Sequence, residues 1–365
     1  MNKSMHKKKL VVLLASYIGQ RTGGAELQAS YLCERGIKTF DMHYVFVSNG
    51  QSYTKPEKLS THAISANCIN NRFSNLKYLY ILKIWMVLKS IRPEFIYQRC
   101  GSALTGIAAI YARLNNCQLV YHIAHDRDVH VKPLSMFIRR PWLIPEYKLM
   151  QYGIKHANTV IAQTQFQAEQ LQKVYKRTAL IIPNGHPVPD DCVKTDNPVT
   201  IVWIANWKPF KQPEIFVKLA ETIGNNANTR FVMLGRSDEY DELAEKAKNN
   251  NIQVMGEVSN EEVNDFLSQS HILINTSQQE GFSNTFIQAW MRRVPVISLQ
   301  VNPDSVFQNE QLGYCSGNFT QLVEDTKKLI ENHELRTRMG SMAREHAIKH
   351  HSLQNMNKIL DLINQ

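Results

Sequence analysis

The chain has 365 residues and carries 42 Lys and Arg against 32 Asp and Glu, a formal net charge of +10. This length exceeds what one hydrophobic core usually supports, so we expect two domains of about 180 residues each. A hydrophobic content of 43% and a mean hydropathy of −0.33 exclude a polytopic membrane protein. The positive charge favours an anionic partner. Because no basic tail, zinc-finger spacing or RNA-binding motif accompanies it, we expect phosphate ligands or anionic lipid, and no nucleic acid.

The first residues combine a basic start with an apolar run, which is the outline of a secretory signal peptide. The run is short, no cleavage site of small residues follows it, and residues 11–15 lead into a Gly-Gly turn. We therefore expect residues 9–15 to form the first strand of an α/β domain. Six cysteines lie scattered without C-x-x-C spacing or partnered histidines, which predicts reduced core residues and a cytoplasmic protein.

The first half of the chain alternates short apolar runs with amphipathic segments, which predicts a doubly wound parallel sheet. Residues 51–75 are polar and irregular, and we expect a surface excursion there. The expected strands are 9–15, 43–48, 94–98, 118–124, 159–163 and 180–183, and the expected helices are 25–37, 76–91, 102–114 and 164–175.

The second half repeats this alternation after a linker rich in Pro and Asp at 187–198. We expect a first domain over residues 1–188, a second over 189–348, and a final amphipathic helix within 349–365. The expected strands are 199–204, 231–234, 271–275 and 294–299, and the expected helices are 213–223, 238–249, 263–270, 284–292, 319–332 and 334–350.

Residues 271–298 carry the strongest local pattern: a buried strand, a polar loop, an amphipathic helix and a second strand. In such a βαβ unit, ligands sit at the carboxyl ends of the strands, where loop residues meet the free amides of the helix's first turn. Glu280 lies in that loop. The helix dipole by itself also favours an acidic residue near a helix start, so the spacing alone leaves a purely structural role open.

The string Ser277-x-x-Glu280-Gly281-Phe282-Ser283-Asn284-Thr285-x-x-Gln288-Ala289 resembles the donor-site signature of retaining GT-B glycosyltransferases of family GT4. The resemblance implies two Rossmann-like domains with an interdomain cleft, and a final helix that crosses back to the first domain. It also implies transfer of a sugar from a nucleotide diphosphate sugar to a hydroxyl group, with the anomeric configuration kept.

The resemblance implies that cationic groups and helix amides bind the diphosphate. Lys211 and the backbone amides of Asn284 and Thr285 match the family positions. Asn206 stands where the family usually has an arginine, and Lys208 is a candidate for the missing charge. A lysine does not reproduce the bidentate fork of an arginine.

The same resemblance places the sugar and the nucleoside. Glu280, a predicted catalytic residue, and the amides of Gly281 and Phe282 would hold sugar hydroxyls. The turn at Gly256 would lie against the base. Gln288 occupies the position of the family's second glutamate, which bonds the ribose hydroxyls, so an amide replaces a carboxylate there.

Further candidates come from the first domain. Gly23 and Gly24 open a helix in a Gly-Gly-x-Glu turn, which lets backbone amides approach a ligand closely or serves only as a tight turn. The strand at 118–124 ends near two histidines. We prefer His125 to His122 as the catalytic histidine, because a histidine within a strand is more often a core residue.

The string Asp126-Arg127-Asp128 spells the D-x-D metal motif of GT-A enzymes, but no other part of a GT-A pattern accompanies it. We therefore expect no metal and no cofactor.

Residues 131–155 mix Arg and Lys with Trp, Phe, Tyr and Leu, which suits a helix lying on anionic lipid. A core helix with a solvated basic face fits the same pattern. Family analogy implies a glycan or lipid-linked acceptor in bacterial surface polysaccharide synthesis, and a cytoplasmic protein at the inner face of the plasma membrane. The alternatives are a nucleotide-sugar epimerase or hydrolase, and a non-catalytic sugar-nucleotide-binding subunit.

Overall fold

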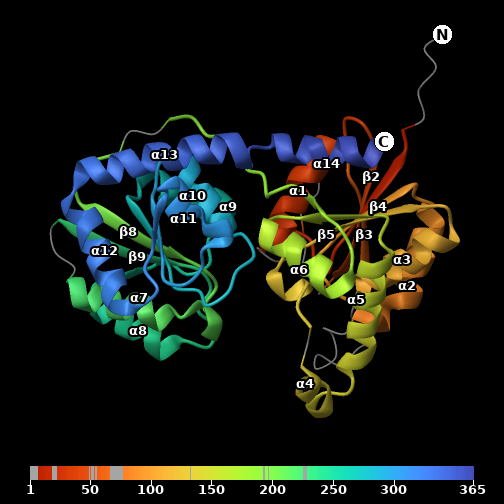
Figure 1. Cartoon of the computed structure of the whole chain (residues 1–365), viewed down its shortest axis with the longest axis horizontal. Helices are drawn as coiled ribbons and strands as arrows, with labels where there is room; N and C mark the ends of the chain where they lie inside the picture. The colour runs from red at the N-terminus through yellow and green to blue at the C-terminus, as the bar shows by residue number, and fades with distance from the viewer. Residues whose placement is uncertain are drawn as a thin grey trace, which may run out of the picture. The chain divides into compact units, whose positions relative to one another are not determined.

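The computed structural model describes residues 7–18, 23–48, 50, 53, 56–65, 77–131, 133–191, 194–195, 197–224 and 228–365. These form two compact units (Figure 1): unit 1 comprises residues 1–185 and 353–365, and unit 2 comprises residues 186–352. The chain thus changes unit at 185/186 and again at 352/353, where the sequence pattern placed boundaries at 188/189 and 348/349. Across the described ranges, no helix is long and apolar enough to cross a membrane.

Unit 1 is built on a seven-stranded parallel sheet in the order β3-β2-β1-β4-β5-β6-β7. Its strands are β1 (Lys9–Leu13), β2 (Asp41–Ser48), β3 (Ser60–Ser65), β4 (Phe95–Arg99), β5 (Gln118–His122), β6 (Thr159–Ala162) and β7 (Leu180–Ile181). Strand β3 corrects the expectation of an irregular excursion over 51–75. It pairs with β2 at the sheet edge and buries little apolar surface, so its sequence lacks the alternation of a half-buried strand.

Strand alternation gives unit 1 two cores. Residues such as Val11 face α2 (Ile81–Ile91), α3 (Ala103–Leu114), α5 (Leu143–His156) and α6 (Gln165–Tyr175). Residues such as Val12 face α1 (Gly24–Gly36) and the last helix, α14 (Gln354–Asn364), which packs on α1. Helices α3 and α5 can approach each other closely because Gly106 has no Cβ. A Cβ there would meet the carbonyl oxygen of Leu149 at 2.3 Å.

The segment predicted as one interfacial helix is two helices, α4 (Leu134–Arg139) and α5. Pro141 lies at the break between them, where its ring and missing N–H oppose a continuous helix.

Unit 2 contains a six-stranded parallel sheet in the order β10-β9-β8-β11-β12-β13. Its strands are β8 (Val199–Ile204), β9 (Thr229–Leu234), β10 (Gln253–Val254), β11 (Ile272–Asn275), β12 (Val296–Ser298) and β13 (Gly313–Cys315). Helices on both faces close two further cores. They are α7 (Pro213–Ile223), α8 (Asp241–Asn249), α9 (Asn260–Gln269), α10 (Asn284–Met291), α11 (Val306–Glu310), α12 (Phe319–Glu331) and α13 (His333–His351). The doubly wound α/β class predicted from the alternation is confirmed in both units.

Candidate functional site

In unit 2, the loop from β11 to α10 carries Glu280 at the carboxyl edge of the sheet. The Glu280 side chain is 12% exposed and pairs with the ammonium of Lys211, which is 18% exposed. Sequence reasoning gave these two residues separate ligands, the sugar and the diphosphate. The structure brings them together as an ion pair, so any ligand at this edge meets a linked cation and carboxylate.

Backbone contacts between two loops hold this pair in place. Lys211 ends the short helix η4 (Pro209–Lys211), after the loop that follows β8. The buried hydroxyl of Thr276 donates to the carbonyl oxygens of Lys211 at 2.6 Å and Gln212 at 3.0 Å, and accepts from Trp203 Nε1 at 2.9 Å. The amide of Gln278 donates to the carbonyl of Phe210 at 2.8 Å. The backbone of Lys211 is therefore held against the loop that carries Glu280.

A chain of buried hydroxyl and amide groups also orients Glu280. Ser277 Oγ donates to Glu280 Oε1 at 2.9 Å, and Asn275 Nδ2 donates to Ser277 Oγ at 3.2 Å. Ser298 Oγ, on the neighbouring strand, donates to Asn275 Oδ1 at 3.4 Å. The sequence pattern includes Ser277 but predicts no function for it. The signal left unused is a run of small polar residues at the end of an otherwise apolar strand.

The loops after β8, β9 and β10 meet around Asn206. Its Oδ1 accepts from the amide of Arg236 at 3.2 Å, and the amide of Gly235 donates to the carbonyl of Gly256 at 2.7 Å. Gly235 has φ +129°, and a Cβ there would meet the carbonyl oxygen of Ala205 at 1.9 Å. A Cβ on Gly256, which has φ +72°, would meet no atom within 4 Å.

This arrangement places Arg236, to which sequence reasoning gave no role, beside the position where the family arginine is replaced. Its guanidinium pairs with Asp238 at 2.7 Å and lies 4.0 Å from Glu257. The other candidate cation, Lys208, lies 6.0 Å from the centre of the Phe210 ring.

The first turn of α10 contains the remaining predicted diphosphate contacts. Asn284 Oδ1 accepts from His186 Nε2 at 2.9 Å, and the hydroxyls of Ser283 and Thr285 lie 2.8 Å apart. Burial lowers the pKa of His186 to about 4, so this imidazole is neutral at physiological pH. The eight-residue helix presents the backbone amides of its first turn at this end, where an anion is favoured.

The sugar-side residues of the same loop are tightly packed. Gly281 is buried, and the ring of Phe282 lies 4.6 Å from that of His351 at the end of α13.

Gln288 lies one turn further along α10 and is 4% exposed. Its Nε2 donates to Asn260 Oδ1 at 2.9 Å and to Asn264 Oδ1 at 3.0 Å, and both asparagines lie on α9. The amide that replaces the family glutamate therefore joins two helices. Nothing in the local sequence around Gln288 indicates these partners, because they lie 24 and 28 residues away.

In unit 1, the structure separates the two candidate histidines. His122 ends β5, is buried, and hydrogen-bonds Tyr97 Oη at 2.8 Å and Arg99 Nη1 at 3.0 Å through Nδ1. Burial, followed by the charge of Arg99, holds the pKa of His122 well below its usual range. His125 lies beyond the strand and is exposed. The structure thus gives His122 a core position and leaves His125 accessible at the carboxyl edge.

The D-x-D carboxylates have structural partners. Asp126 Oδ1 accepts from Gln167 Nε2 at 2.9 Å, and Asp128 Oδ2 accepts from the amides of Ala124 at 3.1 Å and His125 at 3.3 Å. Within the part of the chain that the structure describes, no three His, Cys, Asp or Glu residues are grouped as metal ligands.

The Gly-Gly turn begins α1, with Gly23 as its N-cap and Gly24 as its first residue. A Cβ on Gly23 would meet Glu26 Oε2 at 2.1 Å, so a larger residue there would displace the Glu26 carboxylate. Glu26 also accepts a hydrogen bond from Ser16 Oγ.

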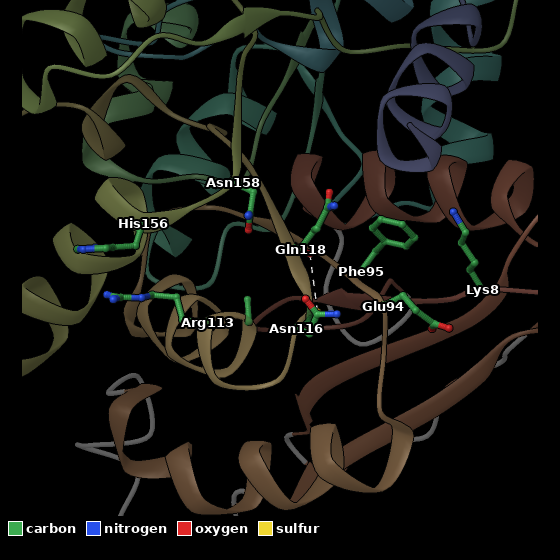
Figure 2. Close-up of a pocket in the computed structure, with 10 residues that line it drawn as sticks. Lys8, Glu94, Phe95, Arg113, Asn116, Gln118, His156 and Asn158 are labelled. Atoms are coloured by element: carbon green, nitrogen blue, oxygen red, sulfur yellow. Dashed lines mark hydrogen bonds between the residues drawn. The ribbon is translucent and has the colours of Figure 1, made fainter.

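A pocket of about 480 Å³ lies at the opposite, amino-terminal edge of the unit 1 sheet (Figure 2). Lys8, Glu94 and Gln118, which come just before or at the start of β1, β4 and β5, contribute to its lining. None of the predicted site residues lines this pocket.

Comparison with known proteins shows a family that unit 2 is similar to. The family described as Glycosyl transferases group 1 matches residues 190–346. This match covers 157 of the 365 residues and lies within unit 2, so unit 2 is similar to this family. The chain is 24% identical over 171 residues to the poly(ribitol-phosphate) alpha-N-acetylglucosaminyltransferase of Staphylococcus aureus (strain COL), an alignment that covers 44% of this chain and 34% of that protein. The chain spans 34 to 57% of the length of three such curated relatives.

Solved structures match this chain over nearly its whole length. Anabaena Alr3699/HepE in complex with UDP and glucose superposes with a TM-score of 0.72 at 14% identity, covering 97% of this chain and 98% of that one. Sucrose-phosphate synthase from Thermosynechococcus elongatus gives a TM-score of 0.77 at 14% identity, with 98% and 99% covered. The fold is GT-B, as the sequence resemblance implied. The core site residues Lys211 and Glu280 lie inside the family match.

Proposed function

We propose that this protein transfers a sugar from a nucleoside diphosphate sugar to a hydroxyl group of an acceptor, with retention of the anomeric configuration as in family GT4. The observation that carries the proposal is the Lys211–Glu280 ion pair at the carboxyl edge of the unit 2 sheet, next to the first turn of α10. This edge combines a cation, oriented amides and a carboxylate in one place. Sugar transfer from a diphosphate needs groups that stabilise the departing charge, and the cation and the amides suit that task.

The chemical task is to stabilise a departing diphosphate. Lys211 would offer its ammonium to the phosphate oxygens, and the amides of Asn284 and Thr285 would donate to the same charge. Such groups are effective because they are oriented before the charge develops, and the Thr276 contacts supply that orientation for Lys211. Arg236 and Lys208 are the candidate cations where Asn206 replaces the family arginine. In this proposal the protein's own cations perform the task, and no metal is used.

Glu280 has a second task. Ser277 and Lys211 both contact Oε1, which leaves Oε2 for the sugar hydroxyls. Glu280 would fix the sugar through its hydroxyl groups, and exposed His125 remains the second proposed catalytic residue. Gln288 would accept from one ribose hydroxyl through Oε1, because its Nε2 is already bonded to Asn260 and Asn264.

The acceptor belongs to unit 1 in this proposal, and we favour a lipid-linked saccharide at an anionic membrane. Support comes from α4, α5 and the turn between them. Ile138, Trp142 and Ile144 are among the exposed large apolar residues, and Arg139 and Arg140 are exposed beside them. The resulting mixture of cationic and apolar side chains suits the headgroup region of a bilayer.

A thermal-shift comparison of UDP, GDP and ADP, and of their sugars, tests the donor. A nucleotide present at about 100 times its Kd stabilises the protein by about 2.7 kcal/mol. We expect one nucleotide to shift the melting temperature, and its sugar conjugate to turn over only when a hydroxyl acceptor is added.

Glu280→Ala then tests the site. We expect transfer to be lost while the free nucleoside diphosphate still binds, since Glu280 contacts the sugar and Lys211 the diphosphate. Nucleotide release from the sugar conjugate without an acceptor would indicate an epimerase or hydrolase. Binding without any turnover would indicate a non-catalytic subunit.

A further inference from the structure

Residues 58–93 contain no Asp or Glu. The same stretch carries six cationic residues, which are Lys58, Arg72, Lys77, Lys83, Lys89 and Arg92. The helix η2 (Lys77–Tyr80) and α2 lie within it. A stretch whose charges all have one sign favours solvent or an anionic partner around it.

Helix α2 presents apolar side chains on two opposite faces. Ile84, Leu88 and Ile91 are buried in the unit 1 core. Leu79, Leu82 and Met86 follow i, i+3, i+7 spacing and are 42%, 75% and 63% exposed. This second stripe, Leu79, Leu82 and Met86, is hereafter the outer stripe. A solvated helix face is normally polar, so the outer stripe indicates a partner.

Lysines flank the outer stripe and keep their charge available. Lys83 Nζ donates to the carbonyl of Ser65 at 3.1 Å, and Lys89 Nζ donates to Asn115 Oδ1 at 2.6 Å. Both partners are neutral oxygens. Among the described residues, neither lysine forms an ion pair with a carboxylate.

The net positive charge of the chain is also concentrated in unit 1. Unit 1 contains 26 Lys and Arg against 10 Asp and Glu, whereas unit 2 contains 16 against 22. The excess positive charge of the protein therefore resides in the unit that carries the outer stripe. Two copies of so basic a unit repel each other, which disfavours a second copy as the covering partner.

The start of η2 is fixed to the rest of unit 1. Glu146 of α5 accepts from the amide of Tyr78 through Oε2 at 3.3 Å and from the amide of Ala103 through Oε1 at 2.9 Å. Burial raises the pKa of Glu146 despite these bonds. The outer stripe is therefore presented by an anchored helix.

We propose that η2 and α2 dock on an anionic lipid surface, with Leu82 and Met86 inserted among the lipid chains and Lys83 and Lys89 against the phosphates. Apolar burial and attraction to anionic headgroups act together in such helices. The proposal deepens the proposed function, since it gives the membrane partner a second contact besides α4 and α5. Its test requires no transfer activity, so it can fail or succeed independently of that function.

The apolar half is tested by flotation with vesicles containing about 30% phosphatidylglycerol in phosphatidylcholine, at low and physiological salt. We expect Leu82→Asn with Met86→Asn to weaken binding about tenfold or more, since each side chain returns to water. The matched control is Val188→Asn with Ile348→Asn, two exposed apolar residues of unit 2 at 46% and 39% exposure, which should bind as the parent does. Parental binding by the Leu82 and Met86 variant would overturn the proposal.

The electrostatic half is tested by Lys83→Gln with Lys89→Gln, against Lys173→Gln with Lys176→Gln on and just after α6 as a control of equal charge. Each lysine near an anionic surface contributes about 1 kcal/mol, so two should change the partition about tenfold to thirtyfold. The role of α2 would be overturned if both lysine pairs lost the same vesicle affinity. It would also be overturned if the parent bound pure phosphatidylcholine as well as it binds the anionic vesicles.

Analytical sedimentation tests the other possible partner, a second copy of the chain. If the parent self-associates and the Leu82→Asn, Met86→Asn variant does not, the outer stripe is a contact between two copies. Circular dichroism and unchanged nucleoside diphosphate binding confirm that each variant is folded.

Discussion

Replacing Lys211 with methionine separates the structural role of the ion pair from its ligand role. The substitution keeps the apolar stem and removes the ammonium, so Glu280 retains Ser277 Oγ but loses its cation. Exposed ion pairs contribute about 0–1 kcal/mol, and breaking a fully buried one costs about 3–5 kcal/mol. At 18% and 12% exposure, this pair lies between those limits. We expect Lys211→Met to lower the free energy of unfolding by about 1–3 kcal/mol.

A second substitution completes the cycle. Glu280→Gln in the Lys211→Met background removes the stranded carboxylate charge, so the double variant should recover about 1 kcal/mol or more, measured by urea unfolding. Nucleoside diphosphate binding should behave differently. Lys211→Met should weaken it by about 1.5–3 kcal/mol in calorimetry, and the second substitution should not restore it.

Two results would contradict this reasoning. Stability effects that add within about 0.3 kcal/mol would show that the two residues are not coupled. Recovery of diphosphate affinity in the double variant would show that Lys211 does not contact the phosphates, and that the loss came from repulsion by the unpaired Glu280.

Three further predictions follow from the structure. Gln288→Ala should weaken nucleotide binding by up to about tenfold, and it should lower the melting temperature because α10 loses its bonds to α9. Gln288→Glu should tighten nucleotide binding by no more than about tenfold. If the Ala variant binds the nucleotide with the parent's affinity, Gln288 does not contact the ribose. Unit 2 should lose stability as the pH falls from about 6.5 to about 4, since burial lowers the pKa of both His186 and His346 to about 4 and the unfolded chain binds these protons first. His186→Gln should reduce that slope in pH-dependent urea unfolding, and an unchanged slope would exclude His186 as one of its sources. Arg139→Ser with Arg140→Ser should release the protein from anionic vesicles at physiological salt and spare activity on a soluble acceptor analogue; equal vesicle binding by both forms would end the role of α4.

The main elements were predictable because each depends on a local pattern. Apolar residues repeat at strand or helix spacing over most of both units, and β8, β11, α10 and β12 follow the segments expected from residues 199–298. Strand β3 was missed because an edge strand with little buried surface carries no clear alternation. The break at Pro141 was visible in the sequence, but the surrounding basic and aromatic composition favoured one continuous helix.

The candidate site was likewise only partly predictable from the sequence. The loop that carries Glu280 and the residue type at 211 could be recognised from short strings, since βαβ units place such loops at the carboxyl edge of a sheet. The ion pair between Lys211 and Glu280 joins residues 69 apart, and no local pattern encodes it. The orientation of Glu280 by Ser277 and Asn275 depends on how the end of β11 packs beside β12.

By itself, the sequence determined most of the segments that become strands and helices, that two parallel α/β units result, and which loops reach the ligand edge, because these properties follow from the period of apolar residues along the chain. Only the tertiary structure decided that His122 is buried while His125 is exposed, that Gln288 bonds two asparagines of α9, and that α2 bears an outer apolar stripe. Those outcomes depend on which side chains meet across a sheet or between helices. Such contacts join residues far apart in the chain, and their free energies are set by burial and pairing in the folded protein.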